Sequence, residues 1–390
     1  MKTYNHLFET LENFYDFLDG IELDKSSQVL LRIHSNVHTA DMMEELTAEL
    51  RKLLPDAVMI GCSTSHVICE GKVLQGACLI SLTVFEESEI RIGMFSCERE
   101  PGTEKDGEAL ATEVSGELVK GDKGLMLTFF PLSYYKTAKF VEHMDRLNEG
   151  LNIIGGVAYV ADGAHSEAGE KAYVIGQTEV SVSKMTAVML VSPKLSIYEN
   201  VICGVESVGR SYEVTKVHGH FVDEIEGTDA AIWYQEMLGR EELEKDPTLA
   251  GIFPLVQEGT QIAYNVVYEP ADTLPEPWKS EKRDRVNLFS EISTGMKFGL
   301  GYFAPQRIVD QLSAVYEELR EAPVETLFAY DCLSRMWMLH DCATWEMGQF
   351  YTTNISGAMM AGEIGNLKGK NLYGNSSFII AGISEKPKAR

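Results

Sequence analysis

The chain has few basic residues for its length, and this deficit limits the partners that it can bind. Its 390 residues include 34 Lys and Arg against 59 Asp and Glu, for a formal net charge of −25. No cluster of Lys and Arg interrupts this acidic balance. A surface of this charge repels polyanions, because contacts with phosphates need local positive charge. DNA, RNA and anionic membranes are therefore poor partners.

Long apolar segments are also missing. No apolar run reaches the roughly 20 residues that span a bilayer, and no apolar segment follows the lysine of the N-terminal residues Met1–His6. The seven cysteines, an odd number, lie mostly in apolar, strand-like segments. This pattern favours free thiols in a reducing compartment over a disulfide framework. We expect a cytoplasmic protein without membrane insertion.

Common motifs of enzymes and metal sites are absent. The sequence contains no GxxxxGK[ST], GxGxxG, HExxH, GxSxG or paired CxxC motif. Two histidine pairs, His34 with His38 and His218 with His220, have spacings that permit metal binding, but neither has an acidic or cysteine partner at ligand spacing. The sequence therefore predicts no metal site. Ligation of haem by one of these histidines is allowed, although no pattern requires a cofactor.

The composition is that of a globular protein, with 45% apolar and 24% charged residues. The length exceeds that of one ordinary core, so two or three domains are expected. Helical and strand-like segments alternate early in the chain and strands dominate later. This order predicts an α+β or mixed α/β fold, with two mixed-sheet domains flanked by helices. No short-period repeat is evident.

The N-terminal segment carries apolar residues at helical spacing. They are Leu7, Leu11, Phe14, Tyr15 and Leu18. They predict an amphipathic helix within residues 1–26, beginning near residue 6 and ending near residue 20. Because its opposite face is acidic, we expect the apolar stripe to pack in the core or an interface rather than on a membrane.

The stretch from Ala57 to Ser65 organises the candidate site. Its four apolar residues predict a buried strand, and five small residues follow them. These five are Gly61, Cys62, Ser63, Thr64 and Ser65. Their backbone N–H groups and hydroxyls can face a ligand at a strand end, where ligands of open α/β sheets usually bind. A tight turn that satisfies its own hydrogen bonds is the simpler alternative.

A second candidate segment follows a predicted buried strand at residues 326–330. Cys332 and Arg335 fall near the end of this strand. Arg335 can grip a ligand carboxylate, favour the Cys332 thiolate, or pair with Asp331 as a structural contact. A catalytic Cys332 needs a base, and His340 lies off the same helical face. The Met- and Trp-rich stretch that follows is interpreted as core packing.

Near the C-terminus, Gly362 and Glu363 bring a carboxylate into a glycine-flanked strand end. This carboxylate can bind a ligand amine, or it can form a salt bridge with Arg335.

Taken in order, a set of motifs resembles the FIST sensory module of bacterial signalling proteins, over about residues 27–385. The motifs are Ile60–Ser65, Gly71, Gly76 and Ile154–Ala158 in the N-terminal half, and Gly204, Gly209–Arg210, Val214–Gly219, Ile225–Ala230, Tyr234, Asp331–Arg335, Gly357, Gly362–Gly365 and Asn375–Phe378 in the C-terminal half. Two positions depart from the family pattern: Asp331 replaces the usual Ser before the closing Cys, and Ala361 replaces the frequent Phe or Tyr before the final Gly-Glu.

The resemblance implies a domain organisation and a function. It implies a FIST N-terminal-like domain over residues 27–193, a FIST C-terminal-like domain over 194–385 and a linker-like tail over 386–390. Members bind small molecules, with amino acids proposed and haem in some, and they control a diguanylate cyclase, a histidine kinase or a chemoreceptor, fused or separate. No such output domain is recognisable in these residues.

We therefore predict a non-enzymatic sensory module with its ligand at strand-end loops. Gly155 and Gly156 join residues 61–65 as backbone donors, and Arg335 and Glu363 act as anchors for the two ends of an amino-acid-like ligand. The alternatives are a thiol-dependent hydrolase or transferase that uses Cys332, a haem-based gas sensor, and a protein-interaction scaffold.

Overall fold

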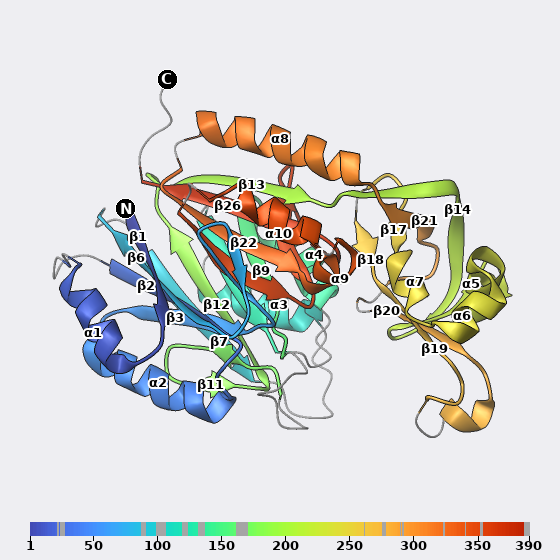
Figure 1. The fold of residues 1–390 in the computed structure, drawn as a ribbon, viewed down its shortest axis with the longest axis horizontal. Helices are drawn as coiled ribbons and strands as arrows, with labels where there is room; N and C mark the ends of the chain where they lie inside the picture. The colour runs from blue at the N-terminus through green and yellow to red at the C-terminus, as the bar shows by residue number, and fades with distance from the viewer. Residues whose placement is uncertain are drawn as a thin grey trace. The chain divides into compact units, whose positions relative to one another are not determined.

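The computed structural model describes the chain except residues 22, 24–27, 87–90, 99–106, 119–123, 132–136, 161–170, 261, 275–277, 289, 291, 323, 340, 352–353 and 386–390. Its contacts divide the chain into two compact units (Figure 1). Unit 1 comprises Met1–Val201, Leu312–Tyr373 and Phe378–Arg390, and unit 2 comprises Ile202–Gln311 and Gly374–Ser377. Unit 1 thus takes strands from both ends of the chain, whereas the division expected at residue 193 follows chain order and stays a prediction. The expected tail at 386–390 lies outside the described residues.

Unit 1 contains three mixed sheets with the same strand order. In each sheet the central strand has an antiparallel neighbour on one side and a parallel neighbour on the other, and a two-stranded hairpin follows the parallel strand. The first sheet runs β1 (Lys2–Phe8), β6 (Cys78–Phe85), β2 (Gln28–Ser35), β3 (Val58–Ser63), β10 (Val174–Ile175), β11 (Val180–Ser181). The second runs β7 (Arg91–Glu98), β12 (Lys184–Val191), β8 (Gly124–Phe130), β9 (Leu151–Val157), β24 (Glu363–Leu367), β25 (Lys370–Gly374). The third runs β13 (Ser196–Ile202), β26 (Phe378–Ser384), β22 (Thr326–Cys332), β23 (Ile355–Met360), β4 (Val67–Cys69), β5 (Lys72–Leu74).

The three sheets exchange their hairpins in a closed cycle. Hairpin β4–β5 follows β3 in the chain but pairs with β23 of the third sheet. Hairpin β24–β25 follows β23 but pairs with β9, and hairpin β10–β11 follows β9 but pairs with β3. Because each sheet is completed by a hairpin from another, we expect unit 1 to unfold as one cooperative body. The repeat is long, so no short period marks it in the sequence.

A glycine occupies the same place in each copy of the repeat. Gly61 of β3, Gly155 of β9 and Gly357 of β23 each lie opposite a residue of the parallel central strand. A Cβ atom on these glycines would lie 1.8, 2.0 and 1.7 Å, respectively, from the carbonyl oxygen of that residue. Only glycine permits this approach of the two backbones.

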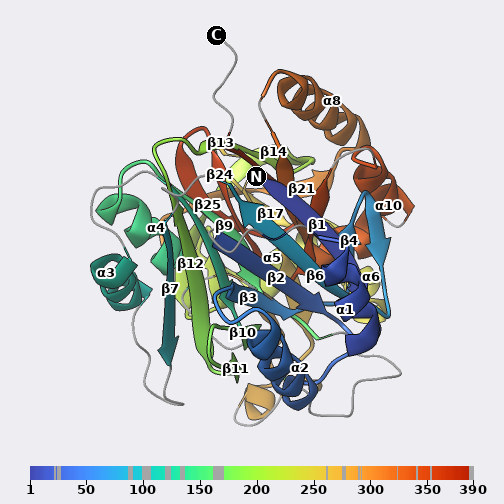
Figure 2. The same ribbon diagram turned by 90° about the vertical axis from the view of Figure 1, so that its left-hand side faces the viewer.

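Helices cover the outward faces of the sheets. Helices α1 (Leu11–Asp19) and α2 (Ala40–Leu53) pack on the first sheet, and α3 (Gly107–Leu118) and α4 (Thr137–Leu147) pack on the second (Figure 2). In β2, Leu31 and Ile33 join the core beneath α2. Because successive strand residues face opposite sides, Arg32 and His34 point into the interior between the sheets. Helices α9 (Leu333–Leu339) and α10 (Asp341–Gly348) form the crossover from β22 to β23, and α8 (Pro305–Glu321) precedes β22.

The mixed sheets with flanking helices confirm the α+β class. The expected N-terminal helix is not confirmed with its predicted start near residue 6. Residues 2–8 form strand β1, which pairs along its length with β6, and α1 begins at Leu11. Thr10 ends the strand and caps the helix by accepting the Asn13 N–H at 3.2 Å. Leu7, placed on the buried stripe by helical spacing, is 42% exposed. The hydrogen bonds between β1 and β6 therefore determine the structure of residues 2–8, although their apolar residues have helical spacing.

Unit 2 is an antiparallel sheet with short helices. Its strand order is β18-β17-β21-β14-β15-β20-β19, with β16 beside β15. The elements are β14 (Val205–His218), β15 (Phe221–Ile225), β16 (Thr228–Asp229), α5 (Ala230–Leu238), α6 (Arg240–Lys245), α7 (Leu249–Ile252), β17 (Leu255–Gln257), β18 (Ala263–Tyr264), β19 (Val266–Glu269), the 3-10 turn Trp278–Glu281, β20 (Arg285–Leu288) and β21 (Lys297–Phe303).

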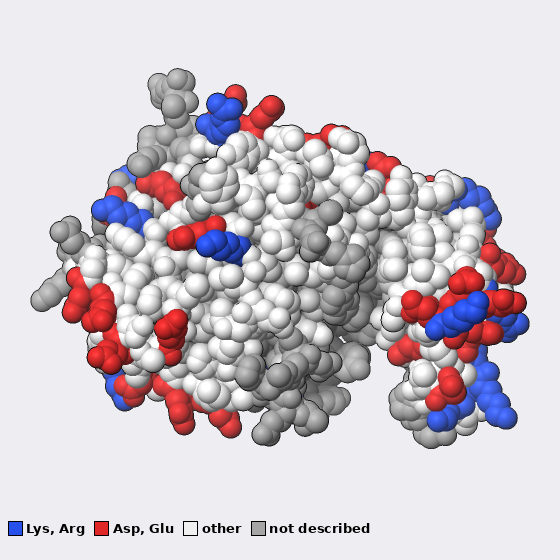
Figure 3. Space-filling model, viewed as in Figure 1, with Lys and Arg blue, Asp and Glu red and all other residues white. Residues whose placement is uncertain are grey.

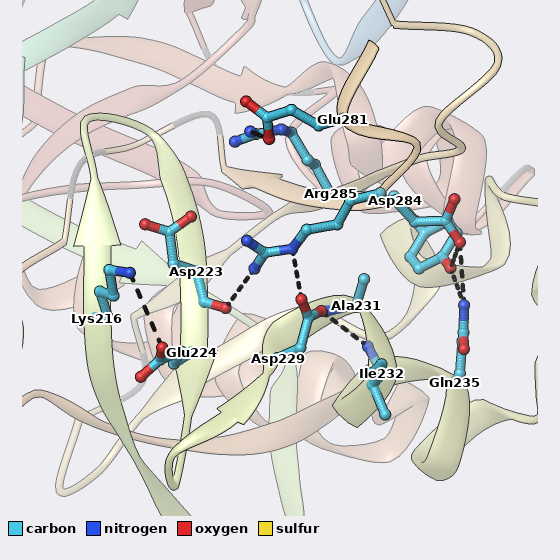
Figure 4. Close-up of polar contacts among 12 residues, drawn as sticks. Lys216, Asp223, Glu224, Asp229, Ala231, Ile232, Gln235, Glu281, Asp284 and Arg285 are labelled. Atoms are coloured by element: carbon cyan, nitrogen blue, oxygen red, sulfur yellow. Dashed lines mark hydrogen bonds and ion pairs between the residues drawn. The ribbon is translucent and has the colours of Figure 1, made fainter. Parts of the chain in front are cut away.

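Polar side chains fix helix α5 to this sheet (Figure 4). Asp229 caps α5 by accepting two N–H groups of its first turn at 2.9 and 3.2 Å, and it pairs with Arg283. Asp284 accepts the Tyr268 hydroxyl at 2.6 Å and the Gln235 amide at 3.0 Å. Both carboxylates have their hydrogen bonds satisfied, so we assign these contacts to stability.

The surface agrees with the acidic composition. Acidic side chains gather where α1 and α2 lie on the face that Figure 3 shows. Among the described helices, none is long and apolar enough to cross a membrane.

Alanine at Gly357 should destabilise unit 1, because the new Cβ would collide with a backbone carbonyl that the sheet holds in place. We expect Gly357→Ala to lower the free energy of unfolding by about 1–3 kcal/mol. The control is Gly116→Ala in α3, where a Cβ meets nothing within 4 Å and where alanine should add up to about 1 kcal/mol. Urea unfolding measures both; equal stabilities for the two variants would contradict the role assigned to the repeated glycine.

Candidate functional site

Three strand ends of unit 1 meet through hydrogen bonds. Just past β3, the Thr64 hydroxyl donates to the Met359 carbonyl of β23 at 2.5 Å, and the Met359 N–H donates to the His66 carbonyl at 3.0 Å. Just past β9, the Tyr159 N–H donates to the Ser63 carbonyl at 3.2 Å. Since Met359 is also the register partner of Asp331 in β22, the predicted strand-end loop lies beside the end of β22.

The glycine pairs also come together. Gly156 of β9 is the register partner of Glu363 in β24, and the Val157 N–H donates to the Gly362 carbonyl at 2.9 Å. A Cβ on Gly156 would lie 2.2 Å from that carbonyl. Gly155 and Gly156 thus serve the close approach of β9 to its neighbours, and their part as donors to a ligand stays a prediction.

Gly61, Cys62 and Ser63 continue strand β3 instead of following it as expected, so only Thr64 and Ser65 lie in the strand-end loop. Ser63 and Thr64 both have hydrogen-bond partners. Ser63 accepts the Tyr173 N–H through Oγ at 2.9 Å and donates its own N–H to the Tyr173 carbonyl at 3.0 Å. The Thr64 hydroxyl bonds to Met359, as described above. Ser63 and Thr64 thus bond to other segments of unit 1, through Tyr173 and Met359, and not only within a tight turn. The buried Ser65 hydroxyl has no partner among the described residues.

Arg335 lies between two buried carboxyl groups. Its Nε lies 3.2 Å from Asp331 Oδ1, and its Nη2 bonds to Glu346 Oε1 of α10. All three side chains are fully buried. Of the alternatives left open for Arg335, these contacts favour the structural ion pair with Asp331, extended by Glu346. We call Asp331, Arg335 and Glu346 the acid–arginine triad.

One guanidinium cannot neutralise both carboxylates of the triad. Burial raises the pKa of Asp331 well above its usual value and that of Glu346 as well, while the Arg335 charge lowers both. Asp331 also feels the Glu346 charge, which raises its pKa further. The two carboxyls together therefore retain a proton. We assign it to Asp331, because Glu346 makes the direct hydrogen bond to the guanidinium. Asp331 Oδ2 and Glu346 Oε2 have no hydrogen-bond partner among the described residues.

Sequence reasoning missed Glu346. The residue sits in the Met- and Trp-rich stretch that was interpreted as core, and most of that interpretation is sound, since Met347 and Phe350 are buried. An acidic residue between Trp345 and Met347 in a largely apolar stretch is the signal in the sequence, because such a residue is either exposed or paired.

The structure places the cysteine of the thiol alternative, Cys332, beside Ser334. The Cys332 Sγ lies 2.9 Å from Ser334 Oγ in a buried position, and His340, its proposed base, lies outside the described residues. A cysteine–histidine contact does occur elsewhere, with Cys62 Sγ 3.5 Å from His34 Nδ1. Burial raises the pKa of Cys62, and burial with the nearby Arg32 charge lowers the pKa of His34 to about 3. This pair stays neutral and does not form the thiolate that a nucleophile requires.

Two of the histidines proposed as metal or haem ligands, His34 and His38, bond to other side chains through Nδ1. His34 is engaged by Cys62 and packs edge-to-face against Phe129 and Tyr330, at 5.4 and 5.9 Å between ring centroids. His38 Nδ1 bonds to the Ser35 hydroxyl at 2.8 Å. Within the described ranges, no three His, Cys, Asp or Glu side chains lie close enough to hold a metal ion.

Removal of the Arg335 charge should destabilise the fold in a pH-dependent way. We expect Arg335→Met to lose about 3–5 kcal/mol at pH 8, because two buried carboxyls lose their cation. The loss should shrink at pH 5, since carboxyls with raised pKa values take up protons in the folded state as pH falls. The matched control is Arg146→Met, which breaks an exposed pair with Glu142 and should change stability by less than about 0.5 kcal/mol. Denaturant unfolding at both pH values measures the two variants; a pH-independent loss would contradict the triad.

Comparison with known proteins agrees with the sequence resemblance. A family model described as FIST N domain matches residues 30–228, a little over half of the chain. No curated protein matches the chain. The matched segment begins in β2 and contains the strand-end loop and the Gly155–Gly156 pair, whereas the likeness of the later residues to the C-terminal half of the module stays a prediction. The family is associated with sensory modules of signal transduction. The chain belongs to the FIST N domain family.

Proposed function

We propose that this chain is a small-molecule sensory module that binds an amino-acid-like ligand at the strand-end site of unit 1. The site comprises the end of β3, the paired glycine segments of β9 and β24, and the acid–arginine triad. Family membership supports the sensory role, and the triad carries the proposal for the ligand.

The triad has more carboxyl groups than cations, and this excess is the observation that carries the proposal. Asp331 and Glu346 share one guanidinium, and each has one buried oxygen without a partner among the described residues. An ammonium group supplies a second positive charge and up to three donors to these oxygens. When it binds, Asp331 releases the proton that burial had retained. An amine ligand is therefore recognised by its charge. Its binding also leaves no buried carboxylate without a cation, which would be unfavourable.

The carboxylate end of such a ligand requires donors. The Ser65 hydroxyl is a buried group whose hydrogen-bond capacity is unused among the described residues. The neighbouring Thr64 and His66 both bond to Met359, the register partner of Asp331. We therefore place the ligand carboxylate at Ser65 and its ammonium at the triad.

Ligand entry requires movement, because the side chains of Ser65 and the triad are at most 1% exposed. The triad is covered by α9 and α10, which form the crossover between the parallel strands β22 and β23. Opening of this crossover would admit the ligand and closure would trap it, so the bound and free states differ in the position of these helices. This two-state element gives the module a signal to transmit.

The partner that reads this signal is an output domain or protein of the diguanylate cyclase, histidine kinase or chemoreceptor type, in a bacterial cytoplasm. The acidic charge of −25 favours a partner surface with basic residues.

A matched panel tests the ligand class. Each amino acid is compared with the carboxylic acid that lacks its amine and with the amine that lacks its carboxylate, by thermal shift and then calorimetry. We expect one group of amino acids to raise the melting temperature, with neither truncated counterpart doing so. The affinity for the ligand should fall by up to about tenfold for each unit by which the pH is lowered, because Asp331 must release its proton when the ligand binds.

Two variants provide the controls. Asp331→Asn should remove both the pH dependence and the preference for amines, whereas Asp284→Asn in unit 2 should leave ligand binding unchanged. Binding of the deaminated acids with equal affinity would contradict the ammonium site. A panel in which no amino acid binds would contradict the ligand class as a whole.

A further inference from the structure

A second polar cluster lies on the opposite face of β22 from the triad. Tyr330 precedes Asp331, so the two side chains point to opposite sides of the sheet. On the interior side, the Arg32 guanidinium stacks on Phe328 with its carbon 3.7 Å from the ring centroid, and the His34 ring meets Tyr330 at 5.9 Å. Arg32 and His34 share one face of β2, as Phe328 and Tyr330 share one face of β22. The four side chains therefore line the same space between the two sheets.

The charge of Arg32 is buried without a counterion in the described part of the chain. Its Nη1 donates to the Ser356 carbonyl at 3.1 Å and its Nη2 donates to the Ser356 hydroxyl at 2.7 Å, and both acceptors are neutral. The side chain is fully buried, and no described Asp or Glu pairs with it. A buried charge that lacks a partner is costly, so an arginine in this position requires compensation.

The His34 ring and the Tyr330 phenol each present a proton to the space beside Arg32. The neutral Cys62 thiol lies next to His34 Nδ1, so the thiol donates to Nδ1 and the imidazole proton lies on Nε2. Burial raises the pKa of Tyr330 to about 12 although the Arg32 charge lowers it, so the phenol keeps its proton and is no counterion. His34 Nε2 has no hydrogen-bond partner among the described residues. The Tyr330 oxygen lies within reach of the Arg32 guanidinium, and its own proton has no acceptor there.

The Arg32 charge has only neutral acceptors, and the protons of Tyr330 Oη and His34 Nε2 have no acceptor among the described residues. These groups together favour an anion. We propose that the interior of unit 1 holds a small monovalent anion, bound by Arg32, Tyr330 and His34. The anion is a halide-sized ion or the carboxylate of a small organic acid, because one negative charge neutralises Arg32 and its lone pairs accept from all three groups. A cation or an amine would be repelled by the buried charge of Arg32. This site shares none of its three residues with the ligand site proposed above, so either can exist without the other.

Anion exchange tests the proposal on the full chain. The protein is exchanged into sodium gluconate, whose polyol chain is too long for an enclosed site, and bromide or formate is added at constant ionic strength. We expect one or both small anions to raise the melting temperature by about 2 °C or more. A response to both indicates a free anion site, and a response to formate alone indicates a site for a carboxylate; either supports the proposal. Equal melting temperatures in all three salts would overturn it.

Variants locate the effect. Tyr330→Phe removes one donor, keeps the ring and should reduce the anion-dependent rise at least by half. Tyr234→Phe is the matched control, because the Tyr234 hydroxyl is equally buried and also lacks a partner among the described residues, but it lies in unit 2. Arg32→Met should abolish the rise. An anion response of the same size in Tyr330→Phe and Arg32→Met as in the Tyr234→Phe control would place the ion elsewhere and overturn the assignment.

Crystals of the unaltered chain grown in the responding anion give a second, direct readout. Bromide is located by its anomalous scattering, and formate by its density. The proposal expects the anion within hydrogen-bond distance of Arg32 Nε and Tyr330 Oη. Anions found at surface positions alone would contradict it.

Discussion

The close approach of a parallel strand to the central strand of each sheet is the constraint on which unit 1 depends. It occurs three times, at Gly61, Gly155 and Gly357, and each time a side chain larger than hydrogen would collide with a backbone carbonyl. Exchange of hairpins then ties each sheet to another in a closed cycle. Stability and site geometry are coupled through this arrangement, because the strands that carry the candidate ligand groups are the same strands that complete their neighbours' sheets.

The alternation of side chains along β22 separates two kinds of chemistry within one strand. Asp331 faces the crossover helices, where it joins Glu346 and Arg335 in a cluster with a surplus of carboxyl groups. Tyr330 faces the interior, where Arg32 brings a surplus of positive charge. Both clusters are buried, and both have polar atoms without partners among the described residues. Buried groups of this kind can bind a small charged molecule, because polar groups whose hydrogen bonds are all made within the protein have none left for a ligand.

The sequence predicted the fold class and the family, since alternating helices and strands and an ordered set of glycine-rich motifs are local features. It placed the strand-end loop, the Gly155–Gly156 pair and the Gly362–Glu363 pair, and the structure brings these segments into contact. It did not indicate the hairpin exchange or strand β1, because both depend on pairing between residues distant in sequence. Glu346 and Arg32 were missed for the same reason: burial turns an ordinary charged residue into a functional candidate, and burial is set by the tertiary fold.

The ligand proposal depends most directly on the protonated carboxyl of Asp331, because this proton marks the excess of carboxyl groups that an amine ligand would satisfy. Infrared difference spectroscopy between the unaltered chain and Asp331→Asn measures it directly at neutral pH. We expect the carbonyl band of a protonated carboxyl in the unaltered chain. This band should be absent from the variant and should disappear when an amine ligand binds. A spectrum with only ionised carboxylate bands at this position would contradict the charge assignment of the triad and the ligand proposal built on it.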